Sequence, residues 1–522
     1  MTAIEIAGRE RGMSFGGGRI VREESLLALF LVVQGIAWTL FPANVWTAPR
    51  SSTVELALWA RDWFIVNYKH PGLPAWMLAG AYELFGTHLW IPFFLSQLCI
   101  ATTYGFVFLL GRDLLDRGAA LLGTLLLPAV SVLTVGALKY NHNIVQLPLW
   151  VAFGFGLWRA SSSDRLFWWV FTAAVAALGI YAKFTMVLVI AFGFLWMVLD
   201  GEARARFRSR TVYIALLVFV VLLLPLAVAL GATDFGSIAW VSQESASRGL
   251  SGPHFVRDVG ETVLVMATAM IGGIALNHVL GIGRMFRGAM ADAAAVLDRR
   301  GLAFLIVIGA GPMLLTLALA LVKPSRLEWA APMYSLLGLL LVAVALRLRP
   351  AVARFAHAGA LHVVLALAAS LVILGTHAAV GMHDRAAGLI DRDLWPTAQM
   401  GPRFDRLWAD RTSRPLRIVA GDTWIAGVVG LLSAGQPSLF TDFDMQRSPA
   451  ITETRLKSEG ALVVWTGDAL WKPASAMIDR FPHGTEIFSV GPKQASVLVD
   501  YLLIAPGAWT DADTEQWLEP SD

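Results

Sequence analysis

Residues 51–89 read SSTVELALWARDWFIVNYKHPGLPAWMLAGAYELFGTHL, and this stretch separates two strongly apolar segments. The segment before it extends from Leu26 to Leu40, and the segment after it from Trp90 to Leu110. If both segments cross a bilayer, the stretch between them is a long connector on one membrane face. Connectors of this length and aromatic content usually carry function.

The composition indicates whether the chain folds in water or in a membrane. Hydrophobic residues make up 57% and charged residues 15% of the 522 residues, and the mean hydropathy is +0.62. Charged residues alone approach a quarter of a soluble protein, so we expect an integral membrane protein. The net charge of +3 does not suggest nucleic acid as a partner. The single cysteine, Cys99, excludes an intrachain disulfide.

Apolar runs near the length that crosses a bilayer recur along the chain, and they predict about 11 transmembrane helices. The first run is expected to be an uncleaved span, because its flank is too long and polar for a signal peptide. The predicted spans are 25–43, 88–110, 118–137, 144–159, 166–181, 184–199, 211–231, 259–281, 302–322, 332–347 and 359–381.

Basic residues predict the orientation of these spans. Lys and Arg are concentrated in the N-terminal arm and in alternate connectors, such as 204–210 and 284–300. Connectors rich in Lys and Arg face the cytoplasm, which places the loop 44–87 on the outer face. An odd number of spans then puts the C-terminal tail on the outer face as well.

The composition and the apolar pattern of the sequence change after Met382. Charges become frequent, and the apolar runs 416–420, 462–465 and 495–504 are separated by Gly, Pro and Asp turns, as in a compact α/β domain. The predicted fold is therefore an all-α polytopic membrane bundle with a C-terminal extracytoplasmic α/β domain. The predicted division is a cytoplasmic arm (1–24), a transmembrane domain (25–382) and an outer domain (383–522).

Each outer connector carries polar residues in apolar or aromatic surroundings, whereas the inner connectors are plain Arg-rich anchors. Any chemistry is therefore expected on the outer face. The outer polar clusters are Glu55 with Lys69 and His70; Lys139, Tyr140, Asn141, His142 and Asn143; Tyr181 with Lys183; 234–254, which includes Arg248; and 323–329, which includes Glu328 and Trp329.

Lys183 lies between two apolar runs. A charge at membrane depth costs several kcal/mol and is rarely kept without a partner or a function. One interpretation is a lysine that extends its ammonium to the membrane interface. The other is a cation held for an anionic ligand, most naturally a lipid phosphate.

Glu55 also has two interpretations. It could pair with Arg50 or Arg61 on a helix at the membrane surface. However, Trp59 follows one helical turn later and shares its face. An apolar, stacking neighbour suits a carboxylate that binds a sugar and acts as a general base.

The remaining polar clusters are open to both structural and functional interpretations. His70 precedes Pro71, which favours a turn, and His70 or Lys69 could in addition touch a substrate. Asn141, His142 and Asn143 could cap the following helix or supply neutral hydrogen bonds to a sugar.

Together, these features resemble the polyprenyl-phosphate-sugar glycosyltransferases of the GT-C class. The similar branch contains aminoarabinose transferases, rhizobial galacturonosyltransferases and protein O-mannosyltransferases. The similarity covers residues 25–345 and, more loosely, the tail. The motifs that carry it are the turn His70-Pro71-Gly72-Leu73; Lys139–Asn143 followed by Pro148-Leu149-Trp150; Tyr181-Ala182-Lys183; Glu328-Trp329-Ala330-Ala331-Pro332; Gly421-Asp422-Thr423-Trp424; and Val463-Val464-Trp465.

The chain departs from the family pattern in two places. The first outer loop has one glutamate, Glu55, with Val54 beside it, where the family usually has an acidic pair. Asn143 stands where many members have an aspartate. With fewer acids, Glu55 is the one strong candidate for the base, no cofactor is required, and a divalent metal is poorly provided for.

The resemblance implies an inverting transfer by direct displacement. Glu55 would take the proton of the acceptor hydroxyl, while Lys183 neutralises the departing lipid phosphate, an electrostatic contribution that grows in a cavity with little water. The resemblance assigns Lys69, Lys139 and Arg248 to the donor phosphate as well. Residues expected to bind substrate are Trp59, His70, Tyr140, Asn141, His142, Asn143, Tyr181, Glu328 and Trp329.

The implied partners are a polyprenyl-phosphate-sugar donor, membrane lipids and a glycolipid acceptor, which is expected to be lipid A, lipopolysaccharide or another envelope glycolipid. The implied location is a bacterial inner membrane, with the C-terminal domain in the periplasm, and a monomer is expected. The alternative function is a polytopic transporter or flippase of lipids or small molecules. A transporter would favour repeat symmetry, and we find no second half that mirrors the first. A non-catalytic scaffold would leave Glu55 and Lys183 unexplained.

Overall fold

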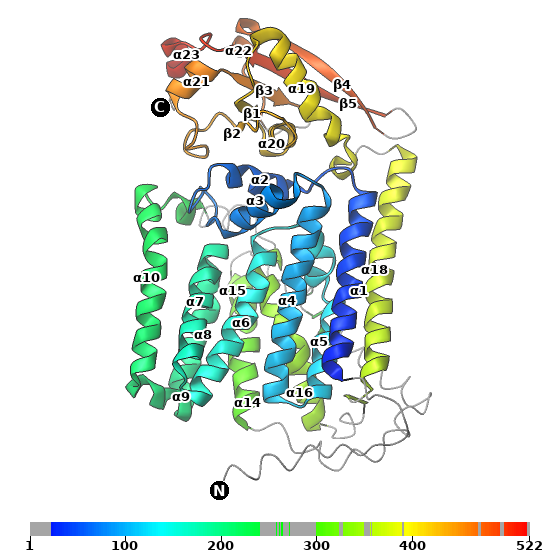
Figure 1. Ribbon diagram of the computed structural model, residues 1–522, viewed down its shortest axis with the longest axis vertical. Helices are drawn as coiled ribbons and strands as arrows, with labels where there is room; N and C mark the ends of the chain where they lie inside the picture. The colour runs from blue at the N-terminus through cyan, green and yellow to red at the C-terminus, as the bar shows by residue number, and fades with distance from the viewer. Residues whose placement is uncertain are drawn as a thin grey trace.

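The computed structural model describes residues 22–240, 299–322, 327–348, 355–356, 358–388, 391–467, 471–490 and 495–518, with a few isolated positions between 257 and 271. Figure 1 shows a bundle of long helices at one end of the molecule and a sheet with its own helices at the other. Two short helices, α2 (Ser51–Arg61) and α3 (Leu73–Phe85), lie between these two parts.

The bundle contains most of the described helical residues. Its elements are α1 (Glu23–Val45), α4 (Trp90–Leu114), α5 (Arg117–Leu125), η1 (Leu127–Ala129), η2 (Ser131–Leu133), η3 (Val135–Leu138), α6 (His142–Ser163), α7 (Leu166–Ala182), α8 (Met186–Leu199), α9 (Gly201–Ala205), η4 (Arg206–Arg208), α10 (Arg210–Ala232), α14 (Arg299–Phe304), η7 (Leu305–Ala310), α15 (Gly311–Val322), η8 (Leu327–Leu336), α16 (Leu337–Leu348) and α18 (Gly359–Ala387).

The expectation of a polytopic helical bundle is confirmed, but its exact number of spans is not. Among the described residues, 6 helices are long and apolar enough to cross a membrane, or up to 8 if two sharply bent pairs each count as one span. The predicted span 259–281 lies outside the described residues, apart from isolated positions. The other predicted spans coincide with described helical segments.

The predicted span 118–137 is not one straight helix. Helix α5 gives way to the short turns η1, η2 and η3, and the two halves of this segment meet at 91°. Pro128 lies in the first turn after α5. Since proline has no N–H to donate and clashes with the preceding turn, it kinks or breaks an α-helix. The bend brings the end of this segment to the N-terminus of α6.

Helix α10 shows most clearly that the bundle faces a lipid solvent. Its hydropathy is 3.0, yet only 11% of its apolar window is buried inside the protein. Leucine and valine side chains such as Leu217 and Val228 are exposed. An apolar surface this continuous is expected where hydrocarbon covers it.

The C-terminal unit, which we define as the described residues from 391 to 518, contains a five-stranded mixed sheet of order β2-β1-β3-β5-β4. Strand β1 is parallel to β2 and β3, whereas β5 is antiparallel to β3 and β4. The three apolar runs predicted from the sequence coincide with β1, β3 and β5. The elements are η9 (Arg392–Leu394), α19 (Thr397–Thr412), β1 (Ile418–Gly421), α20 (Thr423–Leu431), β2 (Ser438–Thr441), α21 (Glu453–Glu459), β3 (Ala461–Trp465), α22 (Ser475–Arg480), β4 (His483–Val490), β5 (Ala495–Ile504) and α23 (Asp511–Trp517).

Helix α2 packs between the two parts of the molecule and belongs to both hydrophobic cores. Val54 and Leu58, one turn apart, are buried in the core of the C-terminal unit. Leu56 and Trp59 are buried in the core of the bundle. Fully burying side chains of this size stabilises by about 1.5–3 kcal/mol each, so neither part releases α2 without a substantial cost.

Polar contacts add to this packing. The Arg61 guanidinium donates hydrogen bonds to the carbonyl oxygens of Gly430 and Leu431, at the C-terminus of α20, and to that of Pro437. Burial lowers the pKa of Arg61 to about 10, and the side chain remains charged at neutral pH. A cation at a helix C-terminus is favoured by the helix dipole. Arg61 therefore ties α2 to the C-terminal unit.

A second connection joins the segment before α2 to the first residues of the C-terminal unit. The backbone N–H groups of Thr47 and Ala48 donate to the carbonyl oxygen of Asp393 at 3.1 Å each. The Arg50 guanidinium forms an ion pair with the carboxylate of Asp393. The unit is thus fixed at two places along its base.

We expect a bulkier residue at position 427 to separate α20 from α2. A Cβ added to Gly427 would lie 2.4 Å from Val54 Cγ1, and overpacking of this kind costs about 1–3 kcal/mol. Gly427→Val should lower the thermal unfolding midpoint of the purified protein and increase proteolysis between the two parts. Gly467→Val is the control, because a Cβ there meets nothing within 4 Å. Equal behaviour of the two variants would contradict the packing described for α2.

Candidate functional site

The loop after α2 folds into a tight turn that presents Tyr68, Lys69 and His70. Val66 and Pro71 pair as an isolated antiparallel bridge. The N–H of Asn67 donates to the carbonyl of His70, and the N–H of Gly72 to that of Ile65, each at 2.9 Å. A Cβ at Gly72 would lie 2.3 Å from the Phe64 carbonyl oxygen, so this close approach requires glycine.

Glu55 accepts hydrogen bonds from two residues of this turn. Lys69 Nζ lies 2.5 Å from Glu55 Oε1, and the Tyr68 hydroxyl lies 3.3 Å from the same oxygen. Within the described residues, both bonds end on Oε1 and neither on Oε2. Arg50 and Arg61, the partners considered from sequence, are instead engaged by the C-terminal unit.

The electrostatics of this group are set by burial and by the carboxylate. Burial lowers the pKa of Lys69, but the charges of Glu55 and Tyr68 and the hydrogen bonds to both residues together outweigh burial, and the net pKa is raised. Burial, followed by the charge of Glu55, raises the pKa of Tyr68. At neutral pH the ammonium therefore stays protonated, and the phenol stays a neutral hydrogen-bond donor.

Two imidazoles lie behind this turn. The rings of His70 and His142 are 4.3 Å apart between centroids, and Trp59 lies 6.0 Å from His142. His142 Nε2 lies 3.3 Å from the Pro71 carbonyl oxygen, which joins the turn to the start of α6. Burial, followed by the positive surroundings of His142, Lys183 and Lys69, lowers the pKa of His70 well below its ordinary value. His70 is therefore neutral at physiological pH.

Lys183 is 5% exposed and follows the last turn of α7. Its ammonium donates to Asn143 Oδ1 at 2.6 Å. Its backbone carbonyl accepts a 2.9 Å hydrogen bond from Gln146 Nε2, and Gln146 Oε1 in turn accepts one from the Thr185 hydroxyl. The N-terminal turn of α6 thus holds both the side chain and the backbone of this lysine.

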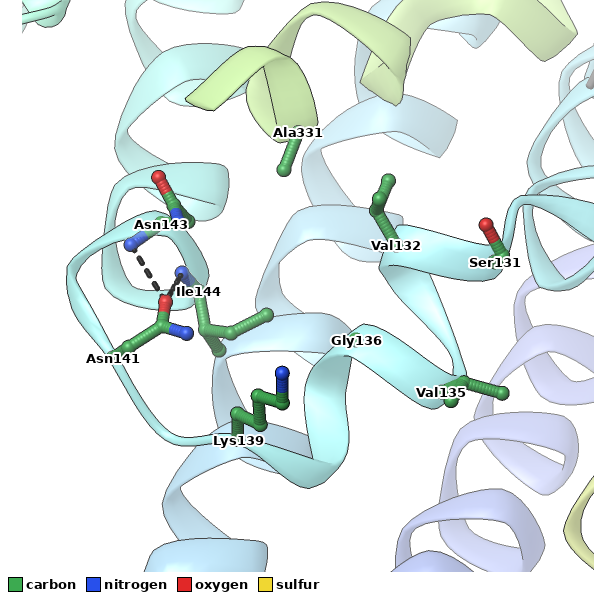
Figure 2. Close-up of a pocket in the computed structure, with 9 residues that line it drawn as sticks. All are labelled: Ser131, Val132, Val135, Gly136, Lys139, Asn141, Asn143, Ile144 and Ala331. Carbon is green, nitrogen blue, oxygen red and sulfur yellow. Dashed lines mark hydrogen bonds between the residues drawn. The ribbon is translucent and has the colours of Figure 1, made fainter. Parts of the chain in front are cut away.

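A cavity of about 270 Å³ opens beside this network (Figure 2). Figure 2 shows the Lys139 side chain extending from the η3 turn toward the space below Val132 and Ala331. The lining residues are Ser131, Val132, Val135, Gly136, Lys139, Asn141, Asn143, Ile144 and Ala331. One ammonium, two side-chain amides and the Ser131 hydroxyl in an otherwise apolar wall suit a small polar headgroup.

Three of the residues predicted to bind substrate hold the site together in this structure. Asn141 is the N-cap of α6, and its side chain accepts from the N–H groups of Asn143 and Ile144 (Figure 2). Tyr140 is fully buried and donates to the Pro74 carbonyl oxygen at 2.9 Å. The Tyr181 hydroxyl donates to the carbonyl oxygen of Leu222 at 3.1 Å. The capping interpretation of Asn141 agrees with this geometry.

The structure also brings in residues that the sequence did not single out. Trp240 follows α10 in the chain. Its ring centroid lies 5.7 Å from the ring centroid of His70 and 5.4 Å from Lys69 Nζ. From the C-terminal unit, Arg447 Cζ lies 5.7 Å from the ring centroid of Tyr68. Arg447 is more than 375 residues away along the chain, so that no local pattern could have connected it to Tyr68.

Other predicted site residues cannot be placed in this cluster. Arg248 lies outside the described residues, and for Glu328 and Trp329 the structure gives the backbone of η8 alone. Across the described part of the chain, no three His, Cys, Asp or Glu side chains are arranged to hold a metal ion.

The described residues therefore form two adjoining groups at the end of the bundle that faces the C-terminal unit. Glu55, Tyr68 and Lys69 form one group, while Lys183, Asn143 and the cavity form the other. Among the described hydrogen bonds and ion pairs, none joins Glu55 to Lys183, and the imidazoles of His70 and His142 lie near both Lys69 and Lys183.

The chain was compared with known proteins. Residues 69–228 match the family model described as dolichyl-phosphate-mannose-protein mannosyltransferase. The lipopolysaccharide core galacturonosyltransferase RgtA of Rhizobium johnstonii is 25% identical over 423 residues, which are 78% of this chain and 80% of that protein.

Two solved structures share the fold. ArnT from Cupriavidus metallidurans, bound to undecaprenyl phosphate, superposes with a TM-score of 0.60 at 15% identity, covering 91% of this chain and 97% of that one. The apo state of the same protein gives a TM-score of 0.61, also at 15% identity, with coverage of 91% and 98%. The family match, the curated relative and the shared fold confirm the resemblance drawn from the motifs: this chain is similar to the polyprenyl-phosphate-sugar glycosyltransferases of the GT-C class.

Proposed function

We propose that this membrane glycosyltransferase moves a hexosyl or pentosyl group from a polyprenyl-phosphate donor to a hydroxyl or phosphate of an envelope glycolipid. The observation that carries the proposal is the grouping of one carboxylate, Glu55, with the cations Lys69, Lys139 and Lys183 at one end of the bundle. A carboxylate beside several cations suits a reaction in which a hydroxyl loses a proton while a phosphate departs.

Glu55 is the general base of this proposal. In a direct displacement, the acceptor oxygen forms a bond to the anomeric carbon as the bond from that carbon to the phosphate oxygen breaks. The proton of the acceptor moves to Glu55, and the electron pair leaves with the lipid phosphate. Oε2 of Glu55 is the oxygen that receives the proton, since the described hydrogen bonds occupy Oε1.

Lys69 is proposed to pair with Glu55 before the donor binds and with the donor phosphate afterwards. Without donor it neutralises Glu55 at 2.5 Å. A phosphate near the turn competes for the same ammonium, because charge-assisted hydrogen bonds to phosphate and to carboxylate are of similar strength. Donor binding thus draws Lys69 away and exposes the base at the moment when its substrate is in place.

Lys183 and Lys139 are proposed to hold the departing phosphate. Lys183 is buried and preorganised by Asn143 and Gln146, and the cavity beside it is lined by Lys139. Preorganised cations in a site with little water are worth more than exposed ones. Undecaprenyl phosphate is bound to the fold relative ArnT, which supports a lipid phosphate as the ligand.

The remaining features of the proposal concern orientation and acceptor. We place the protein in a bacterial inner membrane as a monomer, with the N-terminus in the cytoplasm and residues 383–522 in the periplasm. The Arg-rich elements α9 and η4 lie at the end of the bundle away from the C-terminal unit (Figure 1), as the positive-inside rule requires of that orientation. The likeness to RgtA, a lipopolysaccharide core galacturonosyltransferase, supports lipid A or lipopolysaccharide as the acceptor.

Glu55→Gln should abolish transfer, because an amide cannot accept the proton. The expected loss in kcat is about 10²–10⁴-fold, measured with purified protein and a radiolabelled polyprenyl-phosphate sugar. Glu83→Gln, on the exposed face of α3, is the control and should keep the wild-type rate. A fully active Glu55→Gln variant would remove Glu55 from the mechanism.

Lys183→Met should weaken donor use much more than acceptor use, because it removes the cation but keeps the length of the side chain. We expect KM for the donor to rise by about tenfold or more, with KM for the acceptor nearly unchanged. Lys472→Met, an exposed lysine of the C-terminal unit, serves as the control. An unchanged donor KM in Lys183→Met would contradict the phosphate assignment.

Mass spectrometry of envelope glycolipids tests the acceptor. Cells that lack the gene should lose one hexose or pentose, or an acidic derivative, from a lipid A or lipopolysaccharide species, and the Glu55→Gln gene should not restore it. If Glu55→Gln restored the wild-type glycolipid pattern, the catalytic proposal would fail and a transport function would be favoured instead.

A further inference from the structure

The C-terminal unit reaches the candidate base through one side chain. Arg447 Cζ lies 5.7 Å from the centroid of the Tyr68 ring, and the Tyr68 hydroxyl donates to Glu55 Oε1 at 3.3 Å. A continuous path of contacts therefore leads from the C-terminal unit, through a phenol, to the carboxylate.

Arg447 is itself held firmly. Its guanidinium contacts the carboxylates of Asp442 and Asp444, each at 3.0 Å. Its backbone N–H donates to Asp444 Oδ1 at 3.1 Å. With two charged partners fixing its plane, the guanidinium presents a defined face to the aromatic ring, and a cation over such a ring is attracted by about 0.5–2 kcal/mol.

We propose that Arg447 is a positioning residue for the general base: it fixes the Tyr68 ring so that the phenol hydroxyl donates to Glu55. The proposal rests on the proposed role of Glu55. It gives the C-terminal unit a part in catalysis, in addition to any part in holding the acceptor. Arg447 touches neither Glu55 nor, in this proposal, the reacting atoms.

The physical consequence concerns the charged form of Glu55. A hydrogen bond donated to a carboxylate stabilises it relative to the protonated acid. The nearby cation polarises the phenol and strengthens its O–H as a donor. Losing either group makes Glu55 easier to protonate, so that transfer is lost at a higher pH on the acid side.

The groups that act on Glu55 come from several elements. Lys69 donates to the same oxygen of Glu55 as Tyr68 does, and His70 and His142 lie behind the turn. From the C-terminal unit, Asp442 lies close enough to Lys69 for the two charges to interact. None of these groups is altered in the variants below, so a change in the pH profile is attributable to Tyr68 and Arg447.

The test measures kcat/KM against pH for four variants of the full-length protein in detergent. Tyr68→Phe keeps the ring and removes the hydroxyl, and we expect the acid limb to move up by about one pH unit, a tenfold loss of rate on that limb. Arg447→Ala should move it in the same direction by a smaller amount, and Arg447→Lys should restore most of the wild-type profile, since a lysine also interacts with an aromatic face.

The double variant Tyr68→Phe/Arg447→Ala decides whether Arg447 acts through Tyr68. If it does, the double variant matches Tyr68→Phe alone. The control is Arg403→Ala. The Arg403 side chain is 49% exposed, against 44% for that of Arg447, and it also forms an ion pair. Its partner, Glu486 at 2.7 Å, is in the sheet. This variant should keep the wild-type profile.

Three results would overturn the inference: an unmoved acid limb in Tyr68→Phe, additive losses in the double variant, or an Arg447→Ala variant that changes KM for the acceptor alone. The last would mean that Arg447 binds the acceptor directly. Glu55→Gln separates the two levels of the argument. If it is inactive while Tyr68→Phe keeps its profile, this inference fails alone; if it is fully active, the proposed function fails first.

Discussion

The structure depends on a helix that two hydrophobic cores share. Helix α2 buries Val54 and Leu58 against the C-terminal unit and Leu56 and Trp59 against the bundle. The helix lies across the end of the bundle (Figure 1), and Glu55 is carried between these two buried faces. The direction of the carboxylate is therefore set by the packing of both parts at once, rather than by a flexible loop.

The electrostatics of the site follow from this enclosure. Each described charge near the end of the bundle has a partner: Lys69 pairs with Glu55, Lys183 bonds Asn143, and Arg447 lies between two carboxylates. Burial makes unpaired charges costly, so the free protein satisfies its cations internally. In the proposed function, a lipid phosphate competes with Glu55 for Lys69 and with Asn143 for Lys183.

The sequence predicted the parts of this protein that depend on local patterns. Long apolar runs predicted the helices, and alternating runs predicted β1, β3 and β5. The spacing of apolar residues along the chain reflects which faces are buried in lipid or in a sheet. Pro128 was recognised as an interruption of its span, but the 91° bend was not predicted, because an apolar run does not reveal how sharply a helix turns. Arg50 and Arg61 were one possible pair of partners for Glu55, whereas in the structure Lys69 reaches it through a turn. Trp240 and Arg447 came from distant segments, and contacts of that kind depend on tertiary packing that no single sequence pattern encodes.

The double attachment of the C-terminal unit has a consequence for how such proteins diversify. Arg61 and Val54 join it to α2, and Asp393 joins it to the segment before α2. A C-terminal unit transplanted from a relative would lack its half of the shared core and would leave α2 partly exposed. The two parts of the chain are therefore expected to evolve together rather than as exchangeable modules.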